Sequence, residues 1–192
     1  MAGAVSTRED AGQSNKMPDS QAQCRVEPRG SASYNRAVAG FETVLTLRGE
    51  AATAELGARI AAALAPGDVV ALSGELGAGK TALARAILRG LGVQGHVPSP
   101  TFTLVQAYET PDLIVHHFDF YRIERASELS ELGLDDAVEG GAVLIEWPER
   151  GMPASMIADA LQIALEPIGE TSRELTISGP ARWRKVLGGA EP

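Results

Sequence analysis

The chain has 192 residues with 25 acidic and 17 basic side chains, and its formal net charge of -8 argues against direct binding of DNA or RNA, which needs clustered Lys and Arg. Its 44% hydrophobic residues suffice for the core of about one globular domain, while no apolar run approaches the roughly 20 residues of a membrane span. The single cysteine, Cys24, excludes an intramolecular disulfide, so we expect a cytoplasmic protein with no membrane or DNA partner.

Residues 1–40 are predicted to be a disordered extension. They show no sustained helical or strand period and are rich in Ser, Gln, Gly, Ala and Arg. No apolar segment follows a basic start, which argues against a secretory signal, and the acidic residues of this stretch weaken a transit-peptide interpretation. The folded domain is therefore expected at residues 41–192.

From Phe41 onward, the hydrophobic pattern predicts alternating strands and helices. In chain order, we expect a strand at 41–48, a helix at 50–64, a strand at 68–73, a helix at 80–91, strands near 102–109 and 113–119, one or two short acidic helices at 125–139, a strand at 142–146, an antiparallel hairpin of strands at 159–166 and 172–178, and a closing helix at 182–187. The continuous apolar run at 68–73 is expected of a strand covered on both faces of a parallel sheet. This order predicts one α/β domain, with a mostly parallel sheet and antiparallel flanking strands.

The segment between the strand at 68–73 and the next helix matches G-x-x-x-x-G-K-S/T, the phosphate-binding loop. Its residues are Gly74, Glu75, Leu76, Gly77, Ala78, Gly79, Lys80 and Thr81. Gly77 and Gly79 allow backbone N–H groups to turn inward around phosphate oxygens. The following helix presents its positive end to the phosphates, Lys80 can reach the β and γ oxygens, and the Thr81 hydroxyl is the expected Mg²⁺ ligand. The loop and its setting predict nucleotide binding in a three-layer domain like that of the P-loop NTPases.

A phosphate loop needs a second acid to hold the metal, usually at the end of a neighbouring hydrophobic strand. Glu146 ends the apolar strand at 142–146, and we expect it to hold Mg²⁺ directly or through water. The alternative is an acid that merely ends a strand beside solvent. Trp147 follows, and a core or lid position is the more common role for such a residue than stacking near the nucleotide.

Asp119 ends another predicted strand, and His117 lies two residues earlier on the same face. Asp119 could contact the Mg²⁺ shell or position the attacking water, and a strand-end salt bridge with Arg122 is the alternative. His116 and His117 are adjacent on a strand and point to opposite faces, so we do not expect them to chelate a metal together.

Thr101 belongs to the segment 99–103, which lies about 20 residues beyond the phosphate loop. Nucleotide switches place a hydroxyl that senses the γ-phosphate at such a position. Taken alone, the segment is a loop stiffened by proline.

Five segments, in this order and at this spacing, resemble the bacterial TsaE family. They are LSGELGAGKT (72–81), VPSPTFTLVQAYE (97–109), HFDFYR (117–122), ELSELGLDD (128–136) and LIEWPER (144–150), and the resemblance covers roughly Glu42 to Gly179. It implies an ATPase required for the threonylcarbamoyl modification of tRNA adenosine next to the anticodon in ANN-decoding tRNAs. Members bind ATP and Mg²⁺, hydrolyse ATP weakly alone and work with the TsaB and TsaD proteins, so tRNA would be reached indirectly through that complex.

The resemblance also implies roles for single residues. The family's first switch falls on Ser99 to Thr103 and its second on His117 to Arg122, while its metal-binding glutamate and tryptophan fall on Glu146 and Trp147. The family's layout places Glu50, in the first predicted helix, at the nucleotide. We accordingly expect Lys80, Thr101, Asp119 and Glu146 to take part in catalysis, with Thr81 and Glu146 as metal ligands.

Other functions use the same loop. A small-molecule kinase usually adds an arginine-bearing lid, but here only Arg122, Arg125 and Arg150 lie near the predicted metal site. A GTPase switch is disfavoured because the chain has no N-K-x-D sequence to read guanine. A non-catalytic nucleotide-binding scaffold remains open.

The negative charge is concentrated between Glu109 and Glu149. This stretch holds eleven acidic residues (Glu109, Asp112, Asp119, Glu124, Glu128, Glu131, Asp135, Asp136, Glu139, Glu146 and Glu149) and two basic ones (Arg122 and Arg125). The acids around 124–139 are either a docking surface for a basic partner or a solvated helix face.

Overall fold

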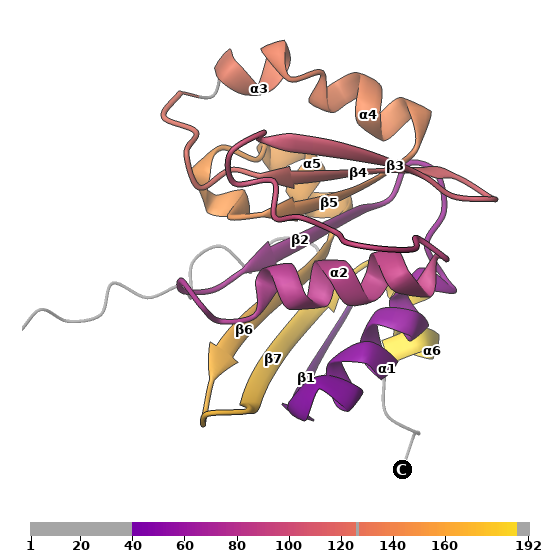
Figure 1. The fold of residues 1–192 in the computed structure, drawn as a ribbon, viewed down its shortest axis with the longest axis vertical. Helices are drawn as coiled ribbons and strands as arrows, with labels where there is room; N and C mark the ends of the chain where they lie inside the picture. Colours follow the sequence, from indigo (N-terminus) through magenta and orange to yellow (C-terminus); the bar gives the residue numbers. More distant parts are fainter. Residues whose placement is uncertain (1–39, 126, 188–192) are drawn as a thin grey trace, which may run out of the picture. The chain divides into compact units, whose positions relative to one another are not determined.

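The computed structural model describes residues 40–125 and 127–187, so the predicted disordered extension lies outside the described residues except for Gly40. The strands form one seven-stranded sheet in the order β1-β7-β6-β2-β5-β4-β3 (Figure 1). The elements are β1 (Phe41–Arg48), α1 (Gly49–Ala61), β2 (Val69–Ser73), α2 (Lys80–Gly90), β3 (Val105–Glu109), β4 (Ile114–Asp119), α3 (Ser127–Glu131), α4 (Leu134–Gly140), β5 (Ala142–Glu146), α5 (Ala154–Asp159), β6 (Leu161–Pro167), β7 (Ser172–Gly179) and α6 (Arg184–Leu187). Short 3₁₀ turns cover Pro148–Arg150 and Ala181–Trp183.

Four central strands are parallel, and the outer strands β1, β7 and β3 are antiparallel to their neighbours. The antiparallel flanks confirm that part of the prediction. The sheet is not mostly parallel, however, because three of its six strand pairings are antiparallel and the parallel part is confined to β6, β2, β5 and β4. In the register of this central part, Asp119 of β4 and Leu72 of β2 both lie opposite Glu146 of β5. The carboxyl ends of three adjacent strands therefore meet at one edge of the sheet.

Each face of the sheet carries its own apolar core. Leu72 and Leu144 pack with residues of α1 and α2, whereas Ala71 and Ile145 pack with residues of α4. Neighbouring residues of one strand enter different cores because side chains alternate along a strand. Helices thus cover both faces, which gives the three layers that the sequence predicts (Figure 1).

Two glycines allow α1 and α2 to approach closely. A Cβ placed on Gly57 of α1 would lie 2.5 Å from the Cβ of Ala86 and 2.6 Å from its carbonyl carbon. A Cβ on Gly90 of α2 would lie 2.8 Å from the Cβ of Ala61. This contact fixes the position of α2, whose first residue is the lysine of the phosphate loop.

The described elements depart from the predicted ones at several places, among them the closing helix predicted at 182–187, which divides into the 3₁₀ turn at Ala181–Trp183 and the short α6. The helix predicted at 50–64 ends at Ala61, where the chain tightens into i to i−3 hydrogen bonds from the amides of Ala63 and Leu64. The strand predicted at 102–109 begins only at Val105, because Leu104 adopts a left-handed conformation with φ of 64°. The short helix α5 was not predicted, and β6 consequently begins at Leu161 rather than at 159.

None of the helices in the described ranges combines the length and the apolar composition that a membrane crossing requires.

We predict that Gly57→Ala destabilises the protein by about 1–3 kcal/mol, because the added methyl group overlaps the backbone of α2. The free energy of unfolding, measured by chemical denaturation, checks this. Gly140→Ala is the matched control, because a Cβ on Gly140 at the end of α4 meets nothing within 4 Å and should change the stability by less than about 0.5 kcal/mol. Equal stabilities of the two variants would contradict the close helix contact.

Candidate functional site

The phosphate loop forms the connection between β2 and α2. Gly74, Gly77 and Gly79 have φ values of 134°, 80° and 110°, which residues with side chains rarely adopt. Gly79 directly precedes α2, so the loop ends where the first N–H groups of an 11-residue helix have no partner within the helix. A glycine-rich loop that leads into a helix N-terminus is an arrangement that can bind an anion.

Lys80 is the first residue of α2, and its ammonium group is turned back onto the start of the loop. Its Nζ atom donates hydrogen bonds to the carbonyl oxygens of Gly74 at 2.7 Å and Glu75 at 2.9 Å. The same atom lies 3.6 Å from the centre of the Trp147 ring. Burial lowers the pKa of Lys80, and the negative charges of nearby carboxylates, Glu146 foremost, oppose that effect. The lysine is therefore held by bonds that phosphate oxygens could replace.

Glu146 is buried, with 2% of its surface exposed, and both of its carboxylate oxygens are engaged. Oε2 accepts a hydrogen bond from Oγ1 of Thr81 at 2.8 Å, and Oε1 lies 2.9 Å from Nε2 of His117. The structure thus brings the two predicted metal ligands together. It excludes the alternative in which Glu146 merely ends a strand beside solvent.

Asp119 lies beside Glu146 in the sheet and is also buried. Its Oδ2 atom accepts a hydrogen bond from Oγ1 of Thr101 at 2.6 Å, and its Oδ1 atom accepts one from the amide of Tyr121 at 2.9 Å. Oγ1 of Thr101 lies in turn 2.9 Å from Oγ of Ser99. The segment 99–103 is therefore tied to the end of β4 through the hydroxyl of Thr101.

The alternative salt bridge between Asp119 and Arg122 is absent from the part of the chain that the structure describes. The guanidinium group of Arg122 instead lies 4.5 Å from the centre of the Phe102 ring. Phe102 of the segment 99–103 and Leu76 of the phosphate loop are each 81% exposed. Two large apolar side chains therefore stand in solvent on the loops that surround the site.

Trp147 adopts a left-handed conformation with φ of 60°, and its amide donates to the carbonyl oxygen of Leu72 at 3.1 Å. Its ring is partly buried between the Lys80 ammonium and the Tyr121 ring, whose centre lies 5.1 Å away. Trp147 therefore forms one wall beside the lysine.

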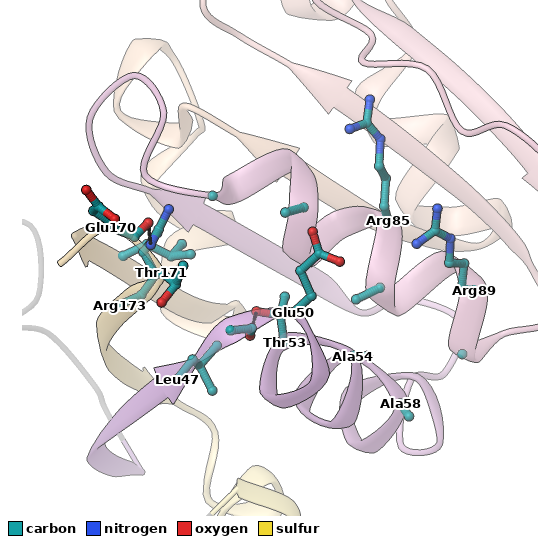
Figure 2. A pocket seen from close by; sticks show the side chains of 16 residues that line it. Leu47, Glu50, Thr53, Ala54, Ala58, Arg85, Arg89, Glu170, Thr171 and Arg173 are labelled. Carbon is teal, nitrogen blue, oxygen red and sulfur yellow. Dashed lines mark hydrogen bonds between the residues drawn. The ribbon is translucent and has the colours of Figure 1, made fainter. Parts of the chain in front are cut away.

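A cavity of about 750 Å³ opens between α1, α2 and the β6–β7 hairpin. Its lining includes Gly79 of the phosphate loop, together with Glu50 and Thr53 of α1 (Figure 2). Figure 2 shows Glu50 extending from the first turn of α1 toward α2. Glu50, which the family resemblance places at the nucleotide, therefore lines a cavity that reaches Gly79 of the phosphate loop, whereas Asp119 and Glu146 are not among the residues that line it.

Arg173 and Arg85 also belong to this region, although the sequence does not predict them there. Nε of Arg173 on β7 donates to the carbonyl oxygen of Ala78 in the phosphate loop at 2.9 Å, and Arg173 also lines the cavity. Nε of Arg85 on α2 donates to the carbonyl oxygen of Val97, at the start of the loop that leads to Thr101. Neither arginine belongs to a motif, and Arg173 lies 95 residues from its partner, so the sequence carried no signal for these contacts.

The acidic residues of the stretch 109–149 fall into two groups. Asp119 and Glu146 are buried in the site. Exposed side chains on or beside α3 and α4 make up most of the other group: Glu124, Glu131, Asp135, Asp136 and Glu139. A surface of this kind is equally suited to solvent and to a basic partner, so the predicted docking role stays a prediction.

The assembled groups can bind phosphates together with a divalent cation. The loop amides and Lys80 supply positive charge, while Thr81 and Glu146 supply the hard oxygen atoms that Mg²⁺ prefers. Within 40–125 and 127–187 there is no group of three or more His, Cys, Asp and Glu side chains placed to hold a metal. Two protein oxygens still fit Mg²⁺, which usually completes its shell with water and substrate phosphates.

Comparison with known proteins gives a consistent picture. Residues 47–175 match the family model described as threonylcarbamoyl adenosine biosynthesis protein TsaE. Proteins named tRNA threonylcarbamoyladenosine biosynthesis protein TsaE are 36% identical in Rickettsia felis, over 70% of this chain and 78% of that protein, and 41% identical in Bacillus subtilis, over 68% and 82%. The crystal structure of YdiB from Bacillus subtilis is similar with a TM-score of 0.62 and 30% identity, over 76% of this chain and 91% of that chain.

We predict that Thr101→Val loosens the segment 97–104, because valine keeps the shape of threonine but cannot donate to Asp119. The lost hydrogen bond to a charged group should cost about 1.5–3 kcal/mol of local stability and speed amide exchange in this segment. Hydrogen exchange followed by mass spectrometry checks this. Thr103→Val, at an exposed position in the same segment, is the control, and equal exchange in both variants would contradict the tie.

Proposed function

Because this chain belongs to the TsaE family of threonylcarbamoyl adenosine biosynthesis proteins, we propose that it serves the formation of threonylcarbamoyladenosine in tRNA as a Mg²⁺-dependent ATPase. The family membership supports the pathway. One observation supports the ATPase activity most strongly. Oγ1 of Thr81 donates a hydrogen bond of 2.8 Å to Oε2 of Glu146, at the end of a glycine-rich loop whose carbonyl oxygens bind the ammonium group of Lys80. A domain like that of the P-loop NTPases is the fold that this combination favours.

The phosphates of ATP would enter the loop between Gly74 and Thr81. The loop amides would donate to phosphate oxygens, and Lys80 would exchange its bonds to the carbonyls of Gly74 and Glu75 for bonds to the β and γ phosphates. This exchange is favourable because burial disfavours the lysine's charge in the free protein, whereas an anion compensates that charge directly.

Thr81 and Glu146 would hold Mg²⁺ beside the phosphates, as their oxygen atoms and mutual distance allow. When bound, the ion neutralises the negative charge of the triphosphate.

Asp119 and Thr101 would take part in hydrolysis. Their hydrogen bond places a carboxylate and a hydroxyl together at the carboxyl end of β4, next to Glu146 in the sheet register. On binding of ATP, Asp119 would orient the attacking water and Thr101 would contact the γ-phosphate. Both groups have protein partners, so hydrolysis by the isolated protein would be weak until ATP and water replace those partners.

The adenosine part of ATP would lie toward the cavity between α1, α2 and the β6–β7 hairpin. The cavity reaches Gly79 of the loop and is lined by Glu50, so a nucleotide bound at the loop could extend into it. Trp147 lies beside Lys80 and would shield the phosphates.

The partners of this chain would be TsaB and TsaD, and tRNA would be reached through their complex in the cytoplasm. The exposed acidic residues around α3 and α4 would favour a basic partner surface rather than tRNA itself.

We predict that Lys80→Ala weakens ATP binding by about 10-fold to 100-fold. The variant loses hydrogen bonds between a charged group and the phosphates, which contribute about 1.5–3 kcal/mol to binding. Isothermal titration calorimetry with a non-hydrolysable ATP analogue measures the affinity. Lys185→Ala in α6 removes a charge from an exposed position and should leave the affinity unchanged. Unchanged affinity in the Lys80 variant would remove the loop from the nucleotide site.

We predict that TsaB and TsaD together increase the release of inorganic phosphate from ATP by this protein, and that Asp119→Ala and Glu146→Ala lower that rate by about 100-fold while retaining ATP binding. A phosphate-release assay with and without the partners measures this. A small-molecule kinase would instead need an acceptor and release no phosphate. A full rate in either variant would exclude that residue from the reaction.

A further inference from the structure

His117 is a buried polar residue to which the proposed reaction assigns no role. It lies on β4, between β5 and the edge strand β3, with none of its surface exposed. Its Nε2 atom lies 2.9 Å from Oε1 of Glu146, while Oε2 of the same carboxylate receives the hydroxyl of Thr81. One oxygen of Glu146 is thus committed to the histidine, and the other faces the phosphate loop.

The chemistry of this contact fixes the proton on the ring. A carboxylate can only accept, so Nε2 must carry the hydrogen that it donates to Oε1. Nδ1 is buried and has no hydrogen-bond partner within the described residues. A buried polar atom without a hydrogen-bond partner lowers the stability of the folded protein, and an apolar side chain would fill the same space without this loss. Packing therefore gives no reason for a histidine here, whereas the bond to Glu146 does.

The contact also restricts where Glu146 can turn. Its carboxylate lies close enough to Lys80 for its negative charge to influence the lysine's pKa. Without a donor on Oε1, the carboxylate could rotate toward that ammonium group, and both the lysine and the metal-facing oxygen would then be unavailable to a nucleotide. The bond to His117 opposes this rotation, because it holds Oε1 on the side of β4.

We propose that His117 is a positioning residue that holds Oε1 of Glu146, so that Oε2 stays beside Thr81 and is presented to Mg²⁺. This inference rests on the proposed function, because it takes Glu146 as a metal ligand. A second group that orients a metal ligand usually changes metal affinity by about 10-fold to 100-fold when removed.

Three substitutions of His117 separate positioning from packing. The amide nitrogen of glutamine can occupy the place of Nε2 and donate to Glu146, so His117→Gln should keep the contact. The amide of asparagine reaches only the place of Nδ1, and leucine has no donor, so His117→Asn and His117→Leu should both lose the contact. The pair of polar variants keeps the comparison valid if leucine does not fold. His116→Leu alters the neighbouring residue on the opposite face of β4 and is the matched control.

The measurement is the affinity of Mg²⁺ for the protein saturated with ADP, together with the affinity of ADP in excess EDTA, both by isothermal titration calorimetry. We expect the Asn and Leu variants to bind Mg²⁺ about 10-fold to 100-fold more weakly, with ADP affinity in EDTA unchanged, while the Gln variant and His116→Leu stay near the unsubstituted protein. Unchanged Mg²⁺ affinity in the Asn variant, or equal losses in the Asn and Gln variants, would overturn the positioning role but leave the proposed function intact. No ADP binding, or no Mg²⁺ binding to the ADP complex, in the unsubstituted protein would overturn both.

Discussion

The parallel pairing of β4, β5 and β2 is the constraint on which the rest of the site depends. This register places Asp119 directly opposite Glu146 and places Leu72, which precedes the phosphate loop by two residues, opposite the same glutamate. A slip by one residue would turn Glu146 to the other face of the sheet, away from Thr81. The apolar cores on both faces prevent such a slip, since it would also expose buried side chains on each strand.

Burial makes each charged group of the site depend on its partners. Lys80, Asp119 and Glu146 are all nearly inaccessible, and an unpaired charge in such a place would be strongly unfavourable. Each group is instead matched: the lysine to loop carbonyls and the Trp147 ring, the aspartate to Thr101 and Tyr121, the glutamate to Thr81 and His117. The partners of the lysine and of the aspartate are ones that ATP and water could replace, whereas His117 lies in the sheet and cannot be displaced by a nucleotide.

The sequence predicted those features that depend on local pattern. The order of strands and helices, the phosphate loop at 74–81 and the two carboxylates at strand ends follow from hydrophobic runs and a spaced motif, and the structure confirms their placement. The roles given to these residues in binding and hydrolysis stay predictions. The bond between His117 and Glu146 joins residues 29 positions apart, and the contact between Arg173 and Ala78 spans 95, so only the folded sheet brings them together. The late start of β3 depends on the left-handed Leu104, a conformation that no residue type signals at this position.

The proposed function requires that this site acts in threonylcarbamoyladenosine formation through ATP bound at Lys80, Thr81 and Glu146. The most direct measurement is the amount of threonylcarbamoyladenosine in bulk tRNA, determined by mass spectrometry of digested nucleosides after the protein is depleted from its host cells. We predict that the modified nucleoside declines, and that expression of the unsubstituted chain restores it while the Glu146→Ala chain at equal abundance does not. An unchanged amount after depletion, or full restoration by the Glu146→Ala chain, would contradict the claim.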